Sequence, residues 1–212
     1  MLTPRIKLFR LLHQNYDFKF KSGQWIDLYA PLDHPKNIGG YTIISSTSET
    51  DAIDLAIRES NSHPVTQYLH QNARVGEVIK ISNGQGKFFL DQSIPVTSLV
   101  FIAGGIGITP ILSMIRSNPH VKKQLFYSVS HEEDILFRDE LAPFSIFTAT
   151  KSYSTQWSGE NCRINGEMLK KYQVDLSSHF YVCGPKSMID SIVLELKQLG
   201  VSSSQIHFEK WW

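Results

Sequence analysis

Residues 99–110 of this 212-residue chain have the pattern of a buried strand, a glycine-rich turn and the start of a helix. The apolar run 99–103 is followed directly by the sequence GGIGITP at 104–110. Glycines allow a sharp turn and close approach of a ligand to the backbone, Thr109 is a candidate helix cap, and Pro110 suits the first helical position. We therefore expect the amides at the start of this helix to bind a diphosphate.

The turn differs from the dinucleotide fingerprint GxGxxG, because counting from Gly105 puts Pro110 at the third glycine position. A tight strand-to-helix connection without a ligand is the alternative. The turn lies within residues 92–115, which carry no charged side chain and are long enough to span a bilayer. The prolines and glycines of this run favour a buried strand, turn and helix instead, so we expect no membrane span.

The first part of the chain has short β-type runs separated by turn residues, which is typical of an antiparallel β-barrel. The expected strands are 5–12, 25–29, 41–45, 53–58, 78–82 and 87–90, with one helix at 65–72.

After Pro95 the pattern changes to buried strands that alternate with helices, which predicts an α/β domain with a doubly wound parallel sheet covered on both faces. The expected strands are 99–103, 124–129, 145–149, 180–183 and 205–208, and the expected helices are 110–116, 132–141, 166–172 and 186–199. The predicted fold is thus a two-domain one, with the barrel at 1–94 and the α/β domain at 95–212.

The charge balance excludes several kinds of partner. The chain has 21 Lys and Arg against 20 Asp and Glu, and neither half is basic, so we expect no nucleic-acid partner and no anionic membrane patch. Two cysteines supply neither a disulfide framework nor a four-ligand metal site, and we predict no metal. A reducing, intracellular compartment follows. The early cations Arg5, Lys7 and Arg10 make only a weak transit signal, which leaves mitochondrial and cytoplasmic locations open.

Motifs in a fixed order resemble the ferredoxin–NADP reductase superfamily, in which a flavin-binding barrel precedes a nicotinamide-dinucleotide domain. They are Gly23-Gln24-Trp25, Tyr41-Thr42, Thr66-Gln67-Tyr68-Leu69, the GGIGITP turn at 104–110 and Cys183-Gly184-Pro185. The sequences IGGYT at 38–42 and FEKWW at 208–212 narrow the resemblance to the oxidoreductase NAD-binding domain-containing protein 1 group.

This resemblance implies a set of flavin contacts. Tyr41 would lie along the flavin, and the hydroxyl of Thr42 would form a hydrogen bond near its N5 atom. Ile43, Val65 and Thr66 complete the expected flavin contacts. FAD is the expected flavin, with FMN less favoured.

The resemblance also implies a dinucleotide site and a hydride-transfer site. The expected dinucleotide contacts are Gly104, Gly105, Ile106, Gly107, Ile108, Thr109, Pro110, Cys183, Gly184 and Pro185. Cys183 would position the nicotinamide against the flavin, Glu209 would lie beside the flavin, and Trp211 would shield the ring. The extra Trp212 leaves open which indole stacks. The catalytic set is therefore Thr42, Cys183 and Glu209.

Two positions depart from the superfamily pattern. Gly39 stands where an arginine usually pairs with the flavin diphosphate, and His63 with Pro64 replaces a segment that commonly begins with glycine. Arg58 is a candidate for the missing charge, although an exposed strand arginine is an equally good interpretation. These departures would permit weaker flavin binding, or none.

The implied function is a flavin-dependent oxidoreductase that transfers hydride from NAD(P)H to bound FAD and passes electrons to an unidentified acceptor, for which a redox protein is one candidate. The acids at 132–134 favour NADH over NADPH, whereas Lys151 is a possible phosphate partner. The alternative is a dinucleotide-binding regulatory module with weak or lost flavin chemistry.

Overall fold

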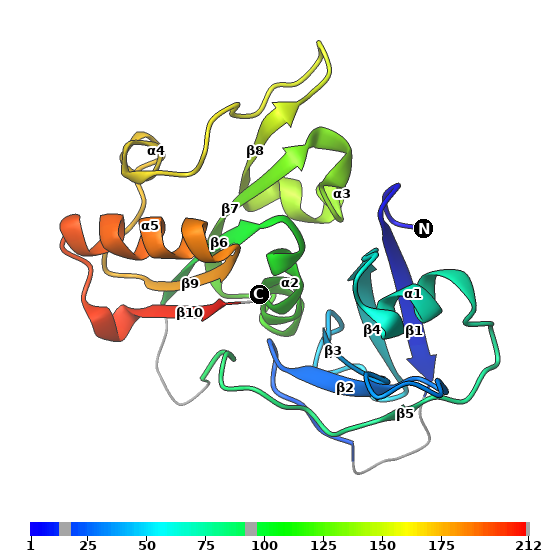
Figure 1. Cartoon of the computed structure of the whole chain (residues 1–212). Helices are drawn as coiled ribbons and strands as arrows, with labels where there is room; N and C mark the ends of the chain where they lie inside the picture. Colours follow the sequence, from blue (N-terminus) through cyan, green and yellow to red (C-terminus); the bar gives the residue numbers. More distant parts are fainter. Residues whose placement is uncertain (13–17, 92–96, 211–212) are drawn as a thin grey trace.

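The computed structural model of the chain describes residues 1–12, 18–91 and 97–210. Antiparallel strands make up the N-terminal part, and a five-stranded parallel sheet makes up the C-terminal part (Figure 1). The expected two-part fold, an antiparallel flavin-type domain followed by an α/β dinucleotide-type domain, is confirmed. The expected boundary between residues 94 and 95 lies outside the described residues.

The N-terminal part holds two small sheets. Its elements are β1 (Ile6–Leu12), β2 (Trp25–Tyr29), β3 (Ile38–Thr42), β4 (Ala52–Arg58), α1 (Pro64–Gln71) and β5 (Lys80–Ile81). Strand β1 pairs with β4, β2 lies between β3 and β5, and a bridge between Ile43 and Leu55 links the two sheets. Both residues of that bridge are fully buried, so the two sheets enclose one core.

Three expected strands of this part differ from the structure. The strand expected at 41–45 lies at Ile38–Thr42, because Gly39 and Gly40 already pair with β2. The strand expected at 78–82 is only Lys80–Ile81. No strand forms at 87–90, where Phe88 and Leu90 are buried in the core that the two parts of the molecule share.

The C-terminal part is a doubly wound sheet. Its elements are β6 (Ser98–Gly104), α2 (Ile108–Ser117), β7 (Lys122–His131), α3 (Arg138–Leu141), β8 (Ser145–Ser152), α4 (Gly166–Lys171), β9 (His179–Gly184), α5 (Lys186–Gln198) and β10 (Ile206–Lys210). All pairs are parallel, in the order β10-β9-β6-β7-β8. The strand order therefore reverses between β6 and β9, because the chain adds β7 and β8 on one side of β6 and then β9 and β10 on the other. Ligands of such sheets bind at that point, outside the carboxyl ends of the strands.

Helices cover both faces of this sheet. Alternate residues of β6 point to opposite faces, so Phe101 belongs to the cluster around α2 while Val100 and Ile102 belong to the cluster around α5. Figure 1 shows α2 on the side of the sheet that faces the barrel, and α4 and α5 on the other side. The barrel residues Ile6 and Ile44 join the α2 cluster, which packs the two parts together.

Polar contacts reinforce this packing. The Ser113 hydroxyl donates to the Ser45 carbonyl oxygen at 2.9 Å, and Nη1 of Arg116 donates to the Ile44 carbonyl oxygen at 3.0 Å. Each contact joins α2 to the segment after β3. The position of α2 against the barrel is thus defined by directional bonds as well as by apolar burial.

The helix expected at 132–141 is interrupted. A 3₁₀ turn spans Glu132–Asp134, and α3 begins only at Arg138. Phe137, between them, has a φ of 51°, a left-handed conformation that ends a right-handed helix. The Arg116 guanidinium lies 4.5 Å from the centre of the Phe137 ring, so a tertiary contact accompanies this break.

No helix within residues 1–12, 18–91 and 97–210 is long and apolar enough to cross a membrane. The same residues contain no group of three or more His, Cys, Asp or Glu side chains arranged to hold a metal ion.

Candidate active site

The glycine-rich turn connects β6 to α2. Strand β6 ends at Gly104, a 3₁₀ turn spans Gly105–Gly107, and α2 begins at Ile108. Gly105 has a φ of 54°, which favours glycine. The expectation that Thr109 caps the helix is wrong, because Thr109 lies inside α2 and its hydroxyl donates to the Ile106 carbonyl oxygen at 2.9 Å. Likewise, Pro110 is the third residue of α2, still within the first turn, where proline is tolerated.

This turn packs against the end of β9. A Cβ atom on Gly107 would lie 2.5 Å from the carbonyl oxygen of Cys183, and a Cβ atom on Gly104 would lie 2.8 Å from Cδ of Pro185. Neither position can hold a side chain without moving its neighbours. The two motifs GGIG and CGP thus form one continuous backbone surface between β6 and β9, where the strand order reverses.

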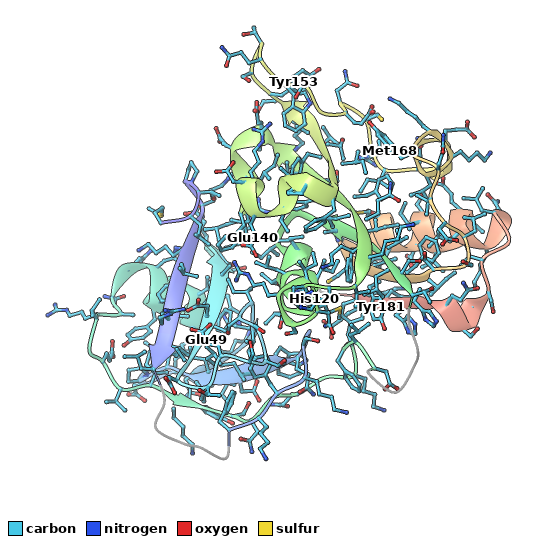
Figure 2. All side chains as sticks on the ribbon, turned by 180° about the vertical axis from the view of Figure 1, so that it is seen from behind. Glu49, His120, Glu140, Tyr153, Met168 and Tyr181 are labelled. Carbon is cyan, nitrogen blue, oxygen red and sulfur yellow. The ribbon has the colours of Figure 1, made fainter. Side chains whose placement is uncertain are left out.

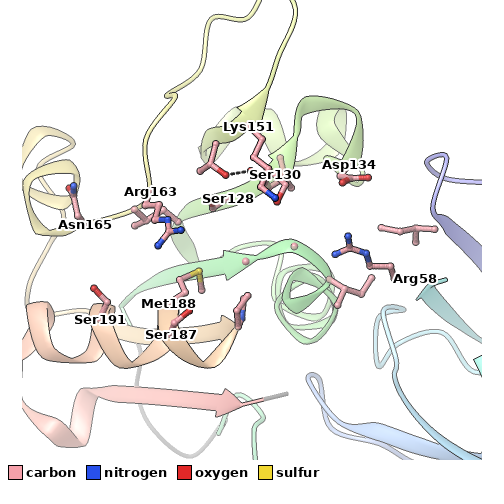
Figure 3. Close-up of a pocket in the computed structure, with 18 of the residues that line it drawn as sticks. Arg58, Ser128, Ser130, Asp134, Lys151, Arg163, Asn165, Ser187, Met188 and Ser191 are labelled. Atoms are coloured by element: carbon pink, nitrogen blue, oxygen red, sulfur yellow. Dashed lines mark hydrogen bonds between the residues drawn. The ribbon is translucent and has the colours of Figure 1, made fainter. Parts of the chain in front are cut away.

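A cavity of about 470 Å³ opens above this surface (Figure 3). Of the predicted dinucleotide residues, Gly104, Gly105, Ile106 and Pro185 line it. The other predicted residues of the two motifs do not line it. Ile108, Thr109, Pro110 and Cys183 are buried and build the helix and strand behind the surface, whereas Gly107 and Gly184 form the contact between the motifs.

Three cationic side chains, Arg58, Lys151 and Arg163, line the same cavity. Nη1 of Arg58 lies 3.8 Å from the Cβ position of Gly105, so this arginine of β4 reaches the glycine-rich turn of the other domain. Within the described ranges, the side chains of these three residues form no hydrogen bond or ion pair with another residue. Such a concentration of uncompensated positive charge favours an anionic ligand.

The sequence patterns did not indicate Arg163. It lies between β8 and α4, in a segment without periodicity or a motif, and only the fold brings it to the cavity. Figure 3 shows Arg163 toward α4 and α5, on the other side of the cavity from Arg58.

Two acids also line the cavity, and both have partners. Arg5 binds Asp134 through two hydrogen bonds, Nε to Oδ1 at 3.2 Å and Nη2 to Oδ2 at 2.5 Å. The carboxylate of Glu195 accepts hydrogen bonds from the Gly166 amide and from the Ser191 hydroxyl. The negative charges of the cavity are therefore engaged, whereas its positive charges are not.

A second cluster lies at the start of α1. Tyr41 Oη and Thr66 Oγ1 are 2.9 Å apart in a hydrogen bond, and the Thr66 amide donates to Nδ1 of His63, the N-cap residue of α1. Burial raises the pKa of Tyr41, so this hydroxyl stays protonated. Hydroxyls, an imidazole and a helix N-terminus are suited to a flavin diphosphate, but the position of the usual arginine is Gly39. These residues fit a flavin without a bidentate cation.

Two other predicted flavin residues, Ile43 and Val65, have fully buried side chains in the barrel core. They could reach a ligand only through their backbone. Trp211 and Trp212 lie outside the described residues.

The three predicted catalytic residues come from separate strands that are linked through Trp25 and Gly86. Glu209 of β10 lies opposite Cys183 of β9 in the parallel pairing. Oε1 of Glu209 lies 3.7 Å from the Cβ position of Gly86, and Nε1 of Trp25 lies 2.7 Å from that same position. Trp25 in turn pairs with Thr42 in the antiparallel sheet. Trp25 and Gly86 therefore connect Thr42 to Glu209 and Cys183 across the domain junction.

Both parts of the chain match models of known protein families. The Oxidoreductase FAD-binding domain model matches residues 3–90, and the Oxidoreductase NAD-binding domain model matches residues 101–193. A solved ferredoxin NADP+ reductase from Neisseria gonorrhoeae, with bound FAD and NADP, is similar at a TM-score of 0.82 and 22% identity, covering 99% of this chain and 94% of that one. The nitric oxide dioxygenase FAD/NAD domain from Vibrio cholerae gives a TM-score of 0.86 at 18% identity, covering 100% and 94%.

Curated relatives extend this match over nearly the whole chain. The carnitine monooxygenase reductase subunit of Escherichia coli is 33% identical and covers 81% of this chain and 52% of its own length. Oxidoreductase NAD-binding domain-containing protein 1 from Pongo abelii is 31% identical over 99% of this chain and 76% of its own length. The chain therefore belongs to the oxidoreductase NAD-binding domain-containing protein 1 family, with the FAD-binding and NAD-binding domains of the ferredoxin reductase-like oxidoreductases.

Proposed function

We propose that this protein is a flavoenzyme that oxidises a reduced nicotinamide dinucleotide and passes the electrons to an acceptor. The observation that carries the proposal is the cavity between β6 and β9, where the strand order of the sheet reverses. It combines a glycine-rich turn with uncompensated cations, and it is bordered by the end of β9, where Pro185 follows Cys183 and Gly184. The proposed division of the chain is a flavin domain at 1–94 and a dinucleotide domain at 95–212.

In the dinucleotide half, the backbone of Gly104, Gly105 and Ile106 would hold the diphosphate. Arg58 would add a cation from the barrel side, because its guanidinium lies over Gly105. The sequence suggested Arg58 as a substitute for the missing flavin arginine. Its place in the cavity supports a role toward the dinucleotide instead.

In the flavin half, Tyr41 would contact the ring system, and Thr66 with His63 would bind the diphosphate at the start of α1. A bound flavin supplies the capacity to accept a hydride and to release electrons singly. Thr42 would donate a hydrogen bond at the ring, and Glu209 would complete the polar edge of the site. Cys183, which is fully buried, would position the nicotinamide indirectly, by fixing the end of β9 that borders the cavity. Trp25 would exclude water from this junction.

The acceptor is proposed to be a separate redox protein. The relatives include a carnitine monooxygenase reductase subunit and a ferredoxin–NADP reductase from Sorangium cellulosum, and their names mention a monooxygenase and ferredoxin as partner proteins. The described residues contain no cluster of metal ligands that could serve as an internal one-electron centre.

The test is anaerobic reduction of the purified protein after incubation with FAD. We expect a flavin absorption spectrum that bleaches when a stoichiometric amount of NADPH or NADH is added. A protein that binds the dinucleotide but neither FAD nor FMN would contradict the proposal. That result would support the second candidate, a dinucleotide-binding regulatory module, for which Gly39 in place of the arginine is the specific observation.

A further inference from the structure

The acids that follow β7 do not offer free carboxylates to the cavity. Oε1 of Glu132 accepts from Nη1 of Arg138 at 2.9 Å, and Oε2 accepts from the Ser154 amide at 2.8 Å. These hydrogen bonds lower the pKa of Glu132 and keep it ionised and engaged outside the cavity. Asp134 faces the cavity but is held by Arg5. The sequence-based reason for favouring NADH is therefore absent from the cavity itself.

Two cations, Lys151 and Arg163, line the cavity beyond the glycine-rich turn. Lys151 is near the carboxyl end of β8, and Arg163 precedes α4. Other cations of the same half are paired, such as Lys171 with Glu160 and Lys210 with Asp190. The side chains of Lys151 and Arg163 have no hydrogen bond or ion pair with any residue that the structure describes.

The order of the strands shows which part of a dinucleotide would reach these cations. A nicotinamide directed to Cys183 lies at the end of β9, and the diphosphate lies at the next strand, β6, on the glycine-rich turn. The adenosine half then extends across the ends of β7 and β8, because the sheet order is β9-β6-β7-β8. Adjacent strands are about 4.8 Å apart, so β8 lies about 10 Å beyond the diphosphate turn, within reach of the adenosine ribose.

We propose that Lys151 and Arg163 form a subsite for the 2′-phosphate of NADPH, and that the protein prefers NADPH to NADH. The inference rests on the proposed dinucleotide function of this cavity. A guanidinium can bind a phosphate through two hydrogen bonds, and an ammonium adds a point charge. Ser128 and Ser130, which line the cavity at the end of β7, add hydroxyl donors.

The engaged carboxylates strengthen this choice. An NADH site commonly uses a carboxylate to accept hydrogen bonds from the 2′ and 3′ hydroxyls of the adenosine ribose. Among the described lining residues, the only carboxylates are those of Asp134 and Glu195, and both accept hydrogen bonds from the protein. At the ends of β7 and β8 the lining thus offers a phosphate the unpaired side chains of Lys151 and Arg163, whereas it offers a ribose diol no unengaged carboxylate.

The test measures the binding of NADP⁺ and NAD⁺ to the whole purified chain by calorimetry, so it does not depend on flavin chemistry. We expect NADP⁺ to bind at least about tenfold more tightly than NAD⁺. We expect Lys151→Ala and Arg163→Ala each to weaken NADP⁺ about tenfold while NAD⁺ changes less than about twofold. Lys170→Ala removes an exposed, ion-paired cation outside this cavity and should change neither affinity.

A second measurement uses 2′,5′-ADP and 5′-AMP as probes, because they differ only in the phosphate at issue. The Arg163→Lys variant should keep part of the preference for 2′,5′-ADP and also controls for loss of folding. Equal losses of NADP⁺ and NAD⁺ affinity in the variants would place the cations at the diphosphate and overturn the inference. Equal affinity of the unmodified protein for both dinucleotides would also overturn it.

The outcomes separate this inference from the proposed function. NADP⁺-selective binding in a protein that never bleaches with NADPH would contradict the oxidoreductase proposal and leave the subsite standing. Flavin reduction with equal efficiency by NADH and NADPH would support the oxidoreductase proposal and overturn the subsite. Absence of binding by either dinucleotide would overturn both.

Discussion

A Cβ atom on Gly39 would lie 2.7 Å from both Cε2 and Oη of Tyr41, because the tyrosine ring occupies the space above this glycine. The ring is held there by the hydrogen bond between the hydroxyls of Tyr41 and Thr66 at the start of α1. An arginine at position 39 cannot coexist with this ring position. The missing arginine and the position of Tyr41 are thus two aspects of one local arrangement.

This relationship predicts different effects of alanine at two neighbouring glycines of β3. Gly39→Ala should displace the Tyr41 ring and break its hydrogen bond, whereas Gly40→Ala meets Trp25 only at an ordinary 3.5 Å contact. Both substitutions gain the same backbone entropy, so the Gly39→Ala protein should be less stable than the Gly40→Ala protein by about 1 kcal/mol. Urea denaturation measures the difference, and equal stabilities would contradict this position of the ring.

Cys183 provides a test of the proposed hydride-transfer geometry. It is fully buried, and its carbonyl oxygen contacts Gly107, so its backbone position is fixed. Cys183→Ser shortens the side chain and should slow flavin reduction by about tenfold or more, because small misplacements at a reacting centre are costly. Stopped-flow absorbance measures the rate. Cys162→Ser, at an exposed cysteine, should leave it unchanged, and an unchanged rate in Cys183→Ser would argue against a positioning role.

The ion pair between Arg5 and Asp134 should contribute to stability as well as to domain packing. Asp134 is buried, so Arg5→Met leaves a carboxylate without its cation and should lower the free energy of unfolding by about 1–3 kcal/mol. Lys170→Met removes one member of an exposed pair and should cost less than about 0.5 kcal/mol. Thermal and urea unfolding of both variants measure the difference in stability loss. Equal losses would show that solvent screens the pair between Arg5 and Asp134.

His207 should make stability depend on pH. Its ring stacks on Tyr181 with centroids 4.6 Å apart, and burial together with the neighbouring His179 lowers its pKa below 6.5. Because the unfolded chain binds a proton more readily at this group, its contribution is fully present above pH 6.5. That contribution is lost as the pH falls through the lowered pKa of the folded protein.

The measurement is the free energy of unfolding between pH 5 and pH 8. Replacement of His207 by glutamine should flatten the fall in stability below pH 6.5. His120→Gln, at an exposed histidine, should retain it, and identical pH profiles for all three proteins would exclude this assignment.

The segment after β8 shows why local sequence patterns did not predict every residue of the cavity. Figure 2 shows Tyr153 at the outer end of this segment, away from the barrel. The segment later returns to the cavity and brings Arg163 to it. No local pattern predicts this return, because the segment lacks the periodicity of a helix or strand.

Local sequence patterns were enough to predict the two-part architecture, the strands of the parallel sheet and the glycine-rich turn after β6. These features depend on apolar periodicity and on the conformational range of glycine, which are local properties of the chain. The break at Phe137 and the pairing of Gly39 and Gly40 in β3 depended on distant neighbours, so the patterns missed them.

Which charges lie close together depends on the folded arrangement of the strands. Arg58 comes from β4 of the barrel, Lys151 from β8 and Arg163 from the segment before α4, and the strand order brings all three to one cavity. The acids after β7 are adjacent to this site in sequence, yet hydrogen bonds to residues outside the cavity hold Glu132 away from it. Sequence proximity identifies the edge of the sheet where a side chain lies, but its rotamer and partners, set by packing, decide which charges a ligand meets.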